Sequence, residues 1–193
     1  MSAVINTRNT IGSRYRTGMW VALASMAMLF TSLSSAYIVR SATSYDWLPV
    51  RMPRAVFVST ALLLISSVTI EISRRKLKHS LHDAYARYLL ITVLLGLVFL
   101  ASQLSAWRQL SAQGVYLASH PHSSFFYLLT GAHAVHMAGG LLALIFLWVR
   151  SRREPGTPVA AAKRQAAADA VSIYWHFMDA LWIYLFLLLF LWR

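Results

Sequence analysis

Four side chains in this sequence could do chemistry because they are ionisable and lie deep inside long apolar stretches. They are His133 and His136 in one stretch, and His176 and Asp179 in the next. Ionisable groups are expensive in hydrocarbon, so each is a candidate for proton transfer, for metal or haem binding, or for hydrogen bonding between helices. The chain has no cysteine, which excludes disulfides, iron–sulfur clusters on thiolates, covalent CxxCH haem and cysteine-ligated copper.

Five apolar segments are long enough to be the elements that position these side chains. A spanning helix needs about 20 mostly apolar residues, because the hydrocarbon core is about 30 Å thick and a helix rises about 1.5 Å per residue. The 193 residues are 58% hydrophobic and 12% charged, whereas a soluble domain has about 25% charged residues. The sequence therefore predicts an all-α, polytopic membrane bundle of five transmembrane helices within residues 18–193, after a tail of residues 1–17. The five segments are residues 19–38, 55–72, 88–107, 125–149 and 171–192.

The lysines and arginines predict how this bundle sits in a membrane. The chain has 18 Lys and Arg against 6 Asp and Glu. Thirteen of the basic residues lie in the tail, in the second-to-third loop or in the fourth-to-fifth loop, and five lie on the other side. The positive-inside rule then places the N-terminus in the cytoplasm and the C-terminus outside. Because basic loops explain the charge, nucleic-acid binding is not expected. The first apolar run is also longer than the roughly 7–15 residues typical of a signal peptide, so cleavage is not expected.

His136 and Asp179 are predicted to meet across two neighbouring antiparallel helices. Counting the helix rise from the predicted segment ends places each about 14 Å from the cytoplasmic edge. We expect the carboxylate to accept a hydrogen bond from the imidazole, within a structural polar network that also includes His133 and His176. Two roles stay open: a polar contact that holds the helices together, and a proton relay. The first role predicts that Asp179→Ala weakens assembly rather than electron transfer.

Three histidines in a bundle also raise the alternatives of haem and metal binding. His133 and His136 share one helix face. His176 lies about 9 Å from the cytoplasmic edge and His133 about 18 Å, which disfavours a haem ligated from both helices. A metal site formed by His133, His136 and Asp179 is the second alternative. We expect neither haem nor metal in this chain.

Two further sites are predicted near the cytoplasmic edge. Glu71 is followed by Arg74 and Arg75 one helical turn later, a spacing that predicts an interfacial ion pair. Arg150 ends the fourth apolar segment. It either reaches toward water as an ordinary flanking arginine or binds a phospholipid headgroup, since a guanidinium matches a phosphate with two hydrogen bonds.

Six short motifs, in order along the chain, resemble motifs of one known protein family. The most specific is residues 172–179 (Ser-Ile-Tyr-Trp-His-Phe-Met-Asp), followed by Trp182. This element resembles the last-helix signature of subunit III of the haem–copper oxidases, which include cytochrome c oxidase and the quinol oxidases. Five spans correspond to the short, five-helix form of that subunit. The other matching motifs are residues 18–20, 60–67, 95–103, residues 131–136 with Gly139 and Gly140, and Arg150, where the family has an arginine that contacts phospholipid.

The resemblance implies a non-catalytic subunit of a terminal oxidase in the bacterial cytoplasmic (inner) membrane. It implies that this chain binds no haem or copper, and that it packs against subunit I, which holds the redox centres, with subunit II in the same complex. It also implies bound phospholipids that guide O2 inward, and support for proton uptake during O2 reduction coupled to proton pumping in aerobic respiration. The electron donor, the haem type and membership of a respiratory supercomplex stay open.

Two departures from the family pattern limit what can be carried over. Met26 and Ala106 stand where the family often has glutamates, so any proton-handling role of those glutamates is not transferred.

Three other interpretations of the function also stay open. One is the equivalent subunit of a quinol oxidase or a nitric oxide reductase, and another is a di-haem membrane anchor. The last is a small independent carrier with a site formed by His133, His136 and Asp179 at the middle of the membrane.

Overall fold

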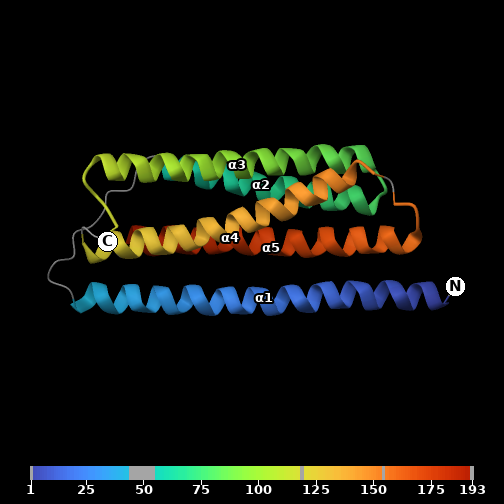
Figure 1. Cartoon of the computed structure of the whole chain (residues 1–193), viewed down its shortest axis with the longest axis horizontal. Coiled ribbons are helices and arrows are strands. Elements are labelled where there is room, and N and C mark those ends of the chain that lie inside the picture. Colours follow the sequence, from blue (N-terminus) through green and yellow to red (C-terminus); the bar gives the residue numbers. More distant parts are fainter. Residues whose placement is uncertain (1, 44–54, 118–119, 154, 192–193) are drawn as a thin grey trace.

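Five long helices make up the chain (Figure 1). The computed structural model describes residues 2–43, 55–117, 120–153 and 155–191, and all regular secondary structure in these ranges is helical. Each helix is long and apolar enough to cross a membrane, so the predicted fold class is confirmed and the chain is an integral membrane protein. The helices are α1 (Ser2–Thr43), α2 (Ala55–Lys78), α3 (His82–Ala112), α4 (Pro121–Ser151) and α5 (Pro158–Leu191).

The helices extend beyond the predicted apolar segments. α1 begins at Ser2, so residues 2–17 of the expected tail are part of the same helix as the first apolar segment. α5 begins at Pro158, well before the apolar segment at 171. The added residues of α5 are rich in alanine, the residue with the highest helix propensity, and proline is favoured in the first turn of a helix. The predicted end of the last segment, at residue 192, lies outside the described residues.

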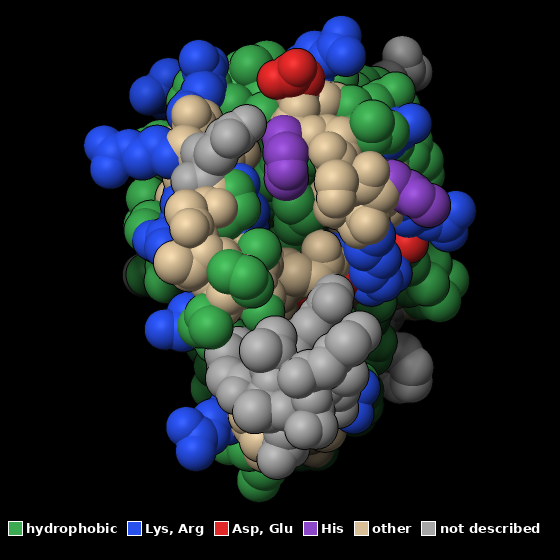
Figure 2. All heavy atoms as spheres, turned by 90° about the vertical axis from the view of Figure 1, so that its right-hand side faces the viewer, with side chains coloured by type: hydrophobic (Ala, Val, Ile, Leu, Met, Phe, Trp, Pro, Cys, Tyr) green, Lys and Arg blue, Asp and Glu red, His purple; other side chains and the backbone are tan. Residues whose placement is uncertain are grey.

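The two ends of the bundle differ in charge. The chain's N-terminus, the α2–α3 turn and the α4–α5 connection all lie at one end, and the C-terminus lies at the other (Figure 1). We call the first the basic end: the start of α1, residues 79–81 and residues 152–157. Figure 2 looks onto it and shows Lys and Arg side chains gathered around its rim. The two sides of the sequence charge count therefore correspond to the two ends of the structure.

α5 packs against three of the other four helices. It contacts α1, α2 and α4, while α3 packs on α2 and α4. α1 contacts only α5 and α4 within the described part of the chain. Its buried side chains form a single stripe at helical spacing, as expected for a helix packed on one side. These are Leu23, Phe30, Ser34 and Tyr37.

Two glycines, Gly96 of α3 and Gly140 of α4, make room for aromatic side chains of α5. A Cβ atom on Gly96 would lie 2.9 Å from Cη2 of Trp175, and one on Gly140 would lie 2.7 Å from Cε1 of Tyr174. Real Cβ contacts are almost never this short. The neighbouring Gly139 faces open space, and a Cβ atom added there would meet nothing within 4 Å. Both glycines are therefore needed for packing: Gly140 lets α4 approach α5 closely, and Gly96 leaves room for the Trp175 ring.

Candidate functional site

A row of polar contacts joins α2 to α5 inside the bundle. Three hydroxyl groups of α2 each meet an aromatic side chain of α5, and these residues all come from the two motifs at 60–67 and 172–182. The indole N–H groups donate to the hydroxyls, while the serine and histidine pair can share its proton in either direction. The pairs are Thr60 with Trp182 at 3.0 Å, Ser66 with Trp175 at 2.9 Å, and Ser67 with His176 at 2.7 Å.

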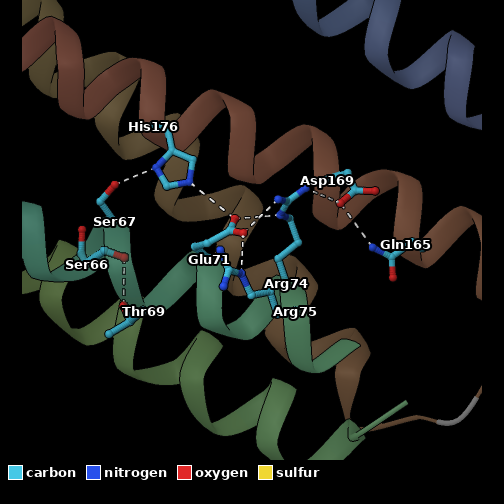
Figure 3. A network of polar contacts seen from close by, with 9 residues as sticks. All are labelled: Ser66, Ser67, Thr69, Glu71, Arg74, Arg75, Gln165, Asp169 and His176. Atoms are coloured by element: carbon cyan, nitrogen blue, oxygen red, sulfur yellow. Dashed lines mark hydrogen bonds and ion pairs between the residues drawn. The ribbon is translucent and has the colours of Figure 1, made fainter. Parts of the chain in front are cut away.

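Toward the basic end the row continues with charged side chains (Figure 3). Arg74 donates to both carboxylate oxygens of Glu71, at 2.8 and 3.0 Å, and Arg75 donates to one of them at 3.0 Å. The structure thus contains both ion pairs that the Glu71 spacing predicts. Arg74 also reaches across to α5, where its Nη1 donates to Asp169 at 3.2 Å. Nε2 of His176 lies 4.0 Å from the Glu71 carboxylate, which links the charged pairs to the hydroxyl pairs.

We call this row the α2–α5 seam, and it keeps one register from end to end. Thr60, Ser67 and Arg74 are spaced by seven residues, so they lie on one face of α2. Asp169 and His176 have the same spacing on α5. As the α2 positions advance toward the basic end, their α5 partners move back along the sequence, as antiparallel helices require. The seam consists of Thr60, Ser66, Ser67, Glu71 and Arg74 with Trp182, Trp175, His176 and Asp169.

Sequence reasoning misses the seam as a unit, although it singles out both of its halves. It gives Asp169 no role, and it includes the serines at 66 and 67 only as part of a motif. The signal that could have found them is the seven-residue repeat of short hydroxyl side chains on α2 opposite a seven-residue repeat of aromatic and polar side chains on α5. A hydroxyl and an indole N–H satisfy each other when both are away from water.

The predicted hydrogen bond between His136 and Asp179 is wrong. Nδ1 of His136 pairs with the carbonyl of Ala132 on its own helix, at 2.7 Å, and its ring packs edge-on against Phe30 of α1. Asp179 is 3% exposed, and neither carboxylate oxygen has a hydrogen-bond partner among the described residues. The Ser67 hydroxyl lies close to this carboxylate, but it makes its hydrogen bond with His176. Depth fixes the level of a residue but not the direction it faces, and these two face different helices.

His133 is part of an aromatic cluster rather than a polar network. Its ring lies 5.1 Å from the Trp182 ring and 6.3 Å, edge-on, from the Phe99 ring, measured between centroids. It is 1% exposed, and neither ring nitrogen has a hydrogen-bond partner among the residues described. The four residues predicted as one network therefore separate: no hydrogen bond in the described structure joins any two of them. Nor do three His, Asp or Glu side chains come together there in a group that could hold a metal ion.

Arg150 lies beside a pocket at the basic end of α4. The pocket has a volume of about 420 Å³, and it is lined by the arginines 150, 153 and 164 together with the exposed apolar side chains of Phe146 and Val149. Arg164 of α5 is 7% exposed. Its guanidinium donates to the carbonyls of Arg150, at 3.2 Å, and Arg153. Carbonyls at the end of a helix lack partners within it, so Arg164 both caps α4 and places a third guanidinium at the pocket.

Met26 and Ala106, which stand where the family often has glutamates, have a packing role in this structure. Ala106 is 1% exposed and belongs to the core, and Met26 packs against that core from α1. Neither position brings an ionisable group into the bundle.

Comparison with known proteins gives one consistent result. Residues 5–193 match the family described as cytochrome c oxidase subunit III. The chain is 36% identical over 174 residues to the "Probable cytochrome c oxidase subunit 3" of Mycobacterium tuberculosis, covering 88% of this chain and 83% of the relative. It is 30% identical over 178 residues to the "Cytochrome c oxidase subunit 3" of Bacillus subtilis, covering 90% and 84%. The "Quinol oxidase subunit 3" of Bacillus spizizenii is 27% identical over 172 residues, covering 88% and 82%.

The family match spans nearly the whole chain, and it includes both motifs that build the α2–α5 seam. Membership also implies association with other oxidase subunits. The chain belongs to the subunit III family of the haem–copper oxidases.

Proposed function

We propose that this chain is a non-catalytic accessory subunit that stabilises subunit I of a terminal oxidase and supports O2 reduction coupled to proton pumping. The observation that carries the proposal is the α2–α5 seam. Its motif side chains are engaged with one another across a helix interface rather than gathered around an open site. Such an arrangement suits a rigid scaffold. Haem and copper would then be held by the partner subunits, with subunit I as the main contact and subunit II in the same complex.

The Arg150 pocket supports a lipid-binding role. Phosphate groups are recognised by arginine through paired, charge-assisted hydrogen bonds. Here Arg150 and Arg153 border a pocket whose other side is the exposed apolar surface of Phe146 and Val149. This combination fits a phospholipid, with its phosphate at the arginines and its acyl chain along α4. Arg150→Gln, assayed by phospholipid bound per purified complex, tests this role: one lipid fewer is expected.

We also propose that the basic end faces the cytoplasm in a bacterial inner membrane. The support is the positive-inside rule, applied to an end at which the chain's start and both strongly basic connections come together (Figure 1). A single cysteine placed in the α4–α5 connection would be labelled by a membrane-impermeant maleimide only after the membrane is opened. Labelling in intact cells would contradict this orientation.

The direct experiment is to purify the tagged chain from its native membrane in a mild detergent. A reduced-minus-oxidised absorbance spectrum then reports the haems that co-purify. We expect haem bands that remain with a larger partner after this chain is stripped away. Haem that stays with this chain would overturn the proposal. A colourless chain that is stable and active alone would favour a carrier instead.

A quinol oxidase is the second candidate host. It is supported by the relative named quinol oxidase subunit 3, which matches over 88% of this chain. The purified complex can be given reduced cytochrome c and a reduced quinol in separate oxygen-consumption assays. The donor that sustains turnover identifies the host.

A further inference from the structure

A second and larger cavity opens at the basic end, between the start of α1, the end of α2 and the start of α5. Its volume is about 910 Å³. It is distinct from the Arg150 pocket, with which it shares only Pro155 and Arg164 among its described lining residues. Figure 2 looks onto the end of the molecule where it opens. Nothing in the proposed scaffold role uses this cavity.

Three cations from three different helices line this cavity. They are Arg16 of α1, Lys78 of α2 and Arg164 of α5. No ion pair involving any of them occurs among the described residues. The acidic residue on the wall, Asp169, is already engaged by Arg74 and Gln165. The cavity therefore concentrates positive charge without a matching carboxylate.

Arg164 is the buried member of these three cations. It is 7% exposed, its Nη2 donates to two backbone carbonyls, and its Nε has no hydrogen-bond partner among the described residues. His82, another lining residue, likewise has an unpartnered and buried Nδ1. A buried cation without a counter-ion is unfavourable. An anion in the cavity would remove that penalty and the mutual repulsion of the three cations.

We propose that this cavity binds a phosphate ester. Arginine and lysine converging from several directions suit a tetrahedral anion with several acceptor oxygens. The cavity is larger than a phosphate ion alone, and Leu77 and Val159 give it apolar wall, so the phosphate carries an organic group. Arg16, Lys78 and Arg164 all lie outside the predicted apolar segments, at the level of lipid headgroups and water. The ester therefore comes either from an anionic phospholipid or from a soluble phosphorylated compound.

The test compares two matched double variants in the purified oxidase complex. Arg16→Gln with Lys78→Gln removes two exposed cations from the cavity wall, so folding is not at risk. The control, Arg75→Gln with Arg152→Gln, makes the same charge change at positions that do not line the cavity. Delipidated complexes are incubated with vesicles of phosphatidylglycerol or of phosphatidylcholine, and retained lipids are counted by native mass spectrometry. Separately, binding of radiolabelled inorganic pyrophosphate is measured.

We expect the cavity variant to bind the phosphate probe about twenty-fivefold more weakly than the wild type and the control, since each of the two cations near the membrane surface contributes about a fivefold change. If the ligand is a lipid, the cavity variant retains one phosphatidylglycerol fewer than the wild type and the control, and pyrophosphate binds to none of the proteins. If the source is soluble, pyrophosphate binding is lost and the lipid count is unchanged. Equal binding by wild type, control and cavity variant in both assays overturns the proposal.

A third variant keeps this result separate from the lipid role of Arg150. Arg150→Gln with Arg153→Gln alters the smaller pocket and leaves both substituted cavity cations, Arg16 and Lys78, in place. If its lipid loss adds to that of the cavity variant, the two sites are independent. If the Arg150 and Arg153 variant loses bound lipid and the cavity variant shows no loss of binding at all, the cavity proposal fails while the Arg150 site stands.

Discussion

The interfaces that α5 forms with α2 and with α4 are built from different chemistry. Toward α2, α5 presents side chains that pair with hydroxyls and charged groups along the whole seam. Toward α4, it relies on close packing, with Tyr174 and Trp175 over Gly140 and Trp182 against His133. Among the described residues, two side chains of α5 donate hydrogen bonds across that second interface: the Tyr174 hydroxyl to the His136 carbonyl at 2.7 Å, and Arg164 to the Arg150 carbonyl at 3.2 Å. In a membrane, apolar burial does not drive helices together, so hydrogen bonds and close packing must do so. α5 relies mainly on hydrogen bonds toward α2 and mainly on close packing toward α4.

The largest expected effect is at Trp175, because it belongs to both interfaces. Its side chain is fully buried, lies against Gly96 and Gly140, and donates to Ser66. Trp175→Ala should destabilise the subunit by about 3–5 kcal/mol, measured as a lower thermal unfolding midpoint of the purified complex and loss of this chain from it. Trp175→Phe keeps a ring but removes the donor. If both variants behave alike, the effect comes from the parts of the indole that Phe lacks: the donor to Ser66 and the ring edge against Gly96.

Gly140 tests the packed interface alone. Gly140→Ala places a methyl group 2.7 Å from the Tyr174 ring, and overpacking of this kind typically costs about 1–3 kcal/mol. Gly139→Ala is the matched control, since its Cβ meets nothing within 4 Å. The same thermal midpoint checks both. Equal midpoints for the two variants would mean that α4 can move away from α5 without loss.

Glu71 tests the charged part of the seam. Glu71→Gln removes the negative charge and one of the two acceptor oxygens that Arg74 and Arg75 share, and leaves Asp169 as the charged partner of Arg74 across the interface. We expect a loss of about 1–2 kcal/mol, as for other charge-assisted hydrogen bonds. Arg75→Gln is the control: it removes the exposed ion pair between Arg75 and Glu71, and it should change the free energy of unfolding by less than about 1 kcal/mol. Retention of this chain during detergent titration measures both.

The smallest effect is expected at Asp179. Because neither of its oxygens has a hydrogen-bond partner among the described residues, Asp179→Asn should change the thermal midpoint by the equivalent of less than about 1 kcal/mol. The sequence-based expectation that Asp179→Ala weakens assembly rests on a hydrogen bond to His136 that does not exist. A variant that assembles normally but turns over slowly would show that the carboxylate handles protons.

The number and class of the helices could be predicted because the length of an apolar run reports the thickness of the membrane. The ends of the helices could not be predicted the same way. A helix continues past the hydrocarbon wherever its residues favour it, as the alanine-rich start of α5 does. Apolar runs locate the membrane, whereas helix propensity and capping locate the ends of the helix.

The candidate site could be predicted in part, for a related reason. The Glu71 ion pairs follow from one helix alone, where spacing determines contact. A contact between two helices also needs the rotation of each helix about its axis. Rise per residue gives His136 and Asp179 the same level, but His136 faces Phe30 of α1. The seven-residue repeats on α2 and α5 carry this rotational information for the α2–α5 seam only.

The position of α5 in the contact pattern has a consequence for biogenesis. α2 and α3 form an antiparallel hairpin with a short turn at residues 79–81, so they can pair as soon as both have left the ribosome. α1 has no contact with that hairpin among the described residues, and its contacts await α4 and α5. α5 follows the other four helices in the sequence and touches three of them. A chain truncated before α5 would therefore hold α1 only through its smaller contact with α4 and would leave the α2 hydroxyls without their α5 partners, a state suited to recognition by membrane quality control.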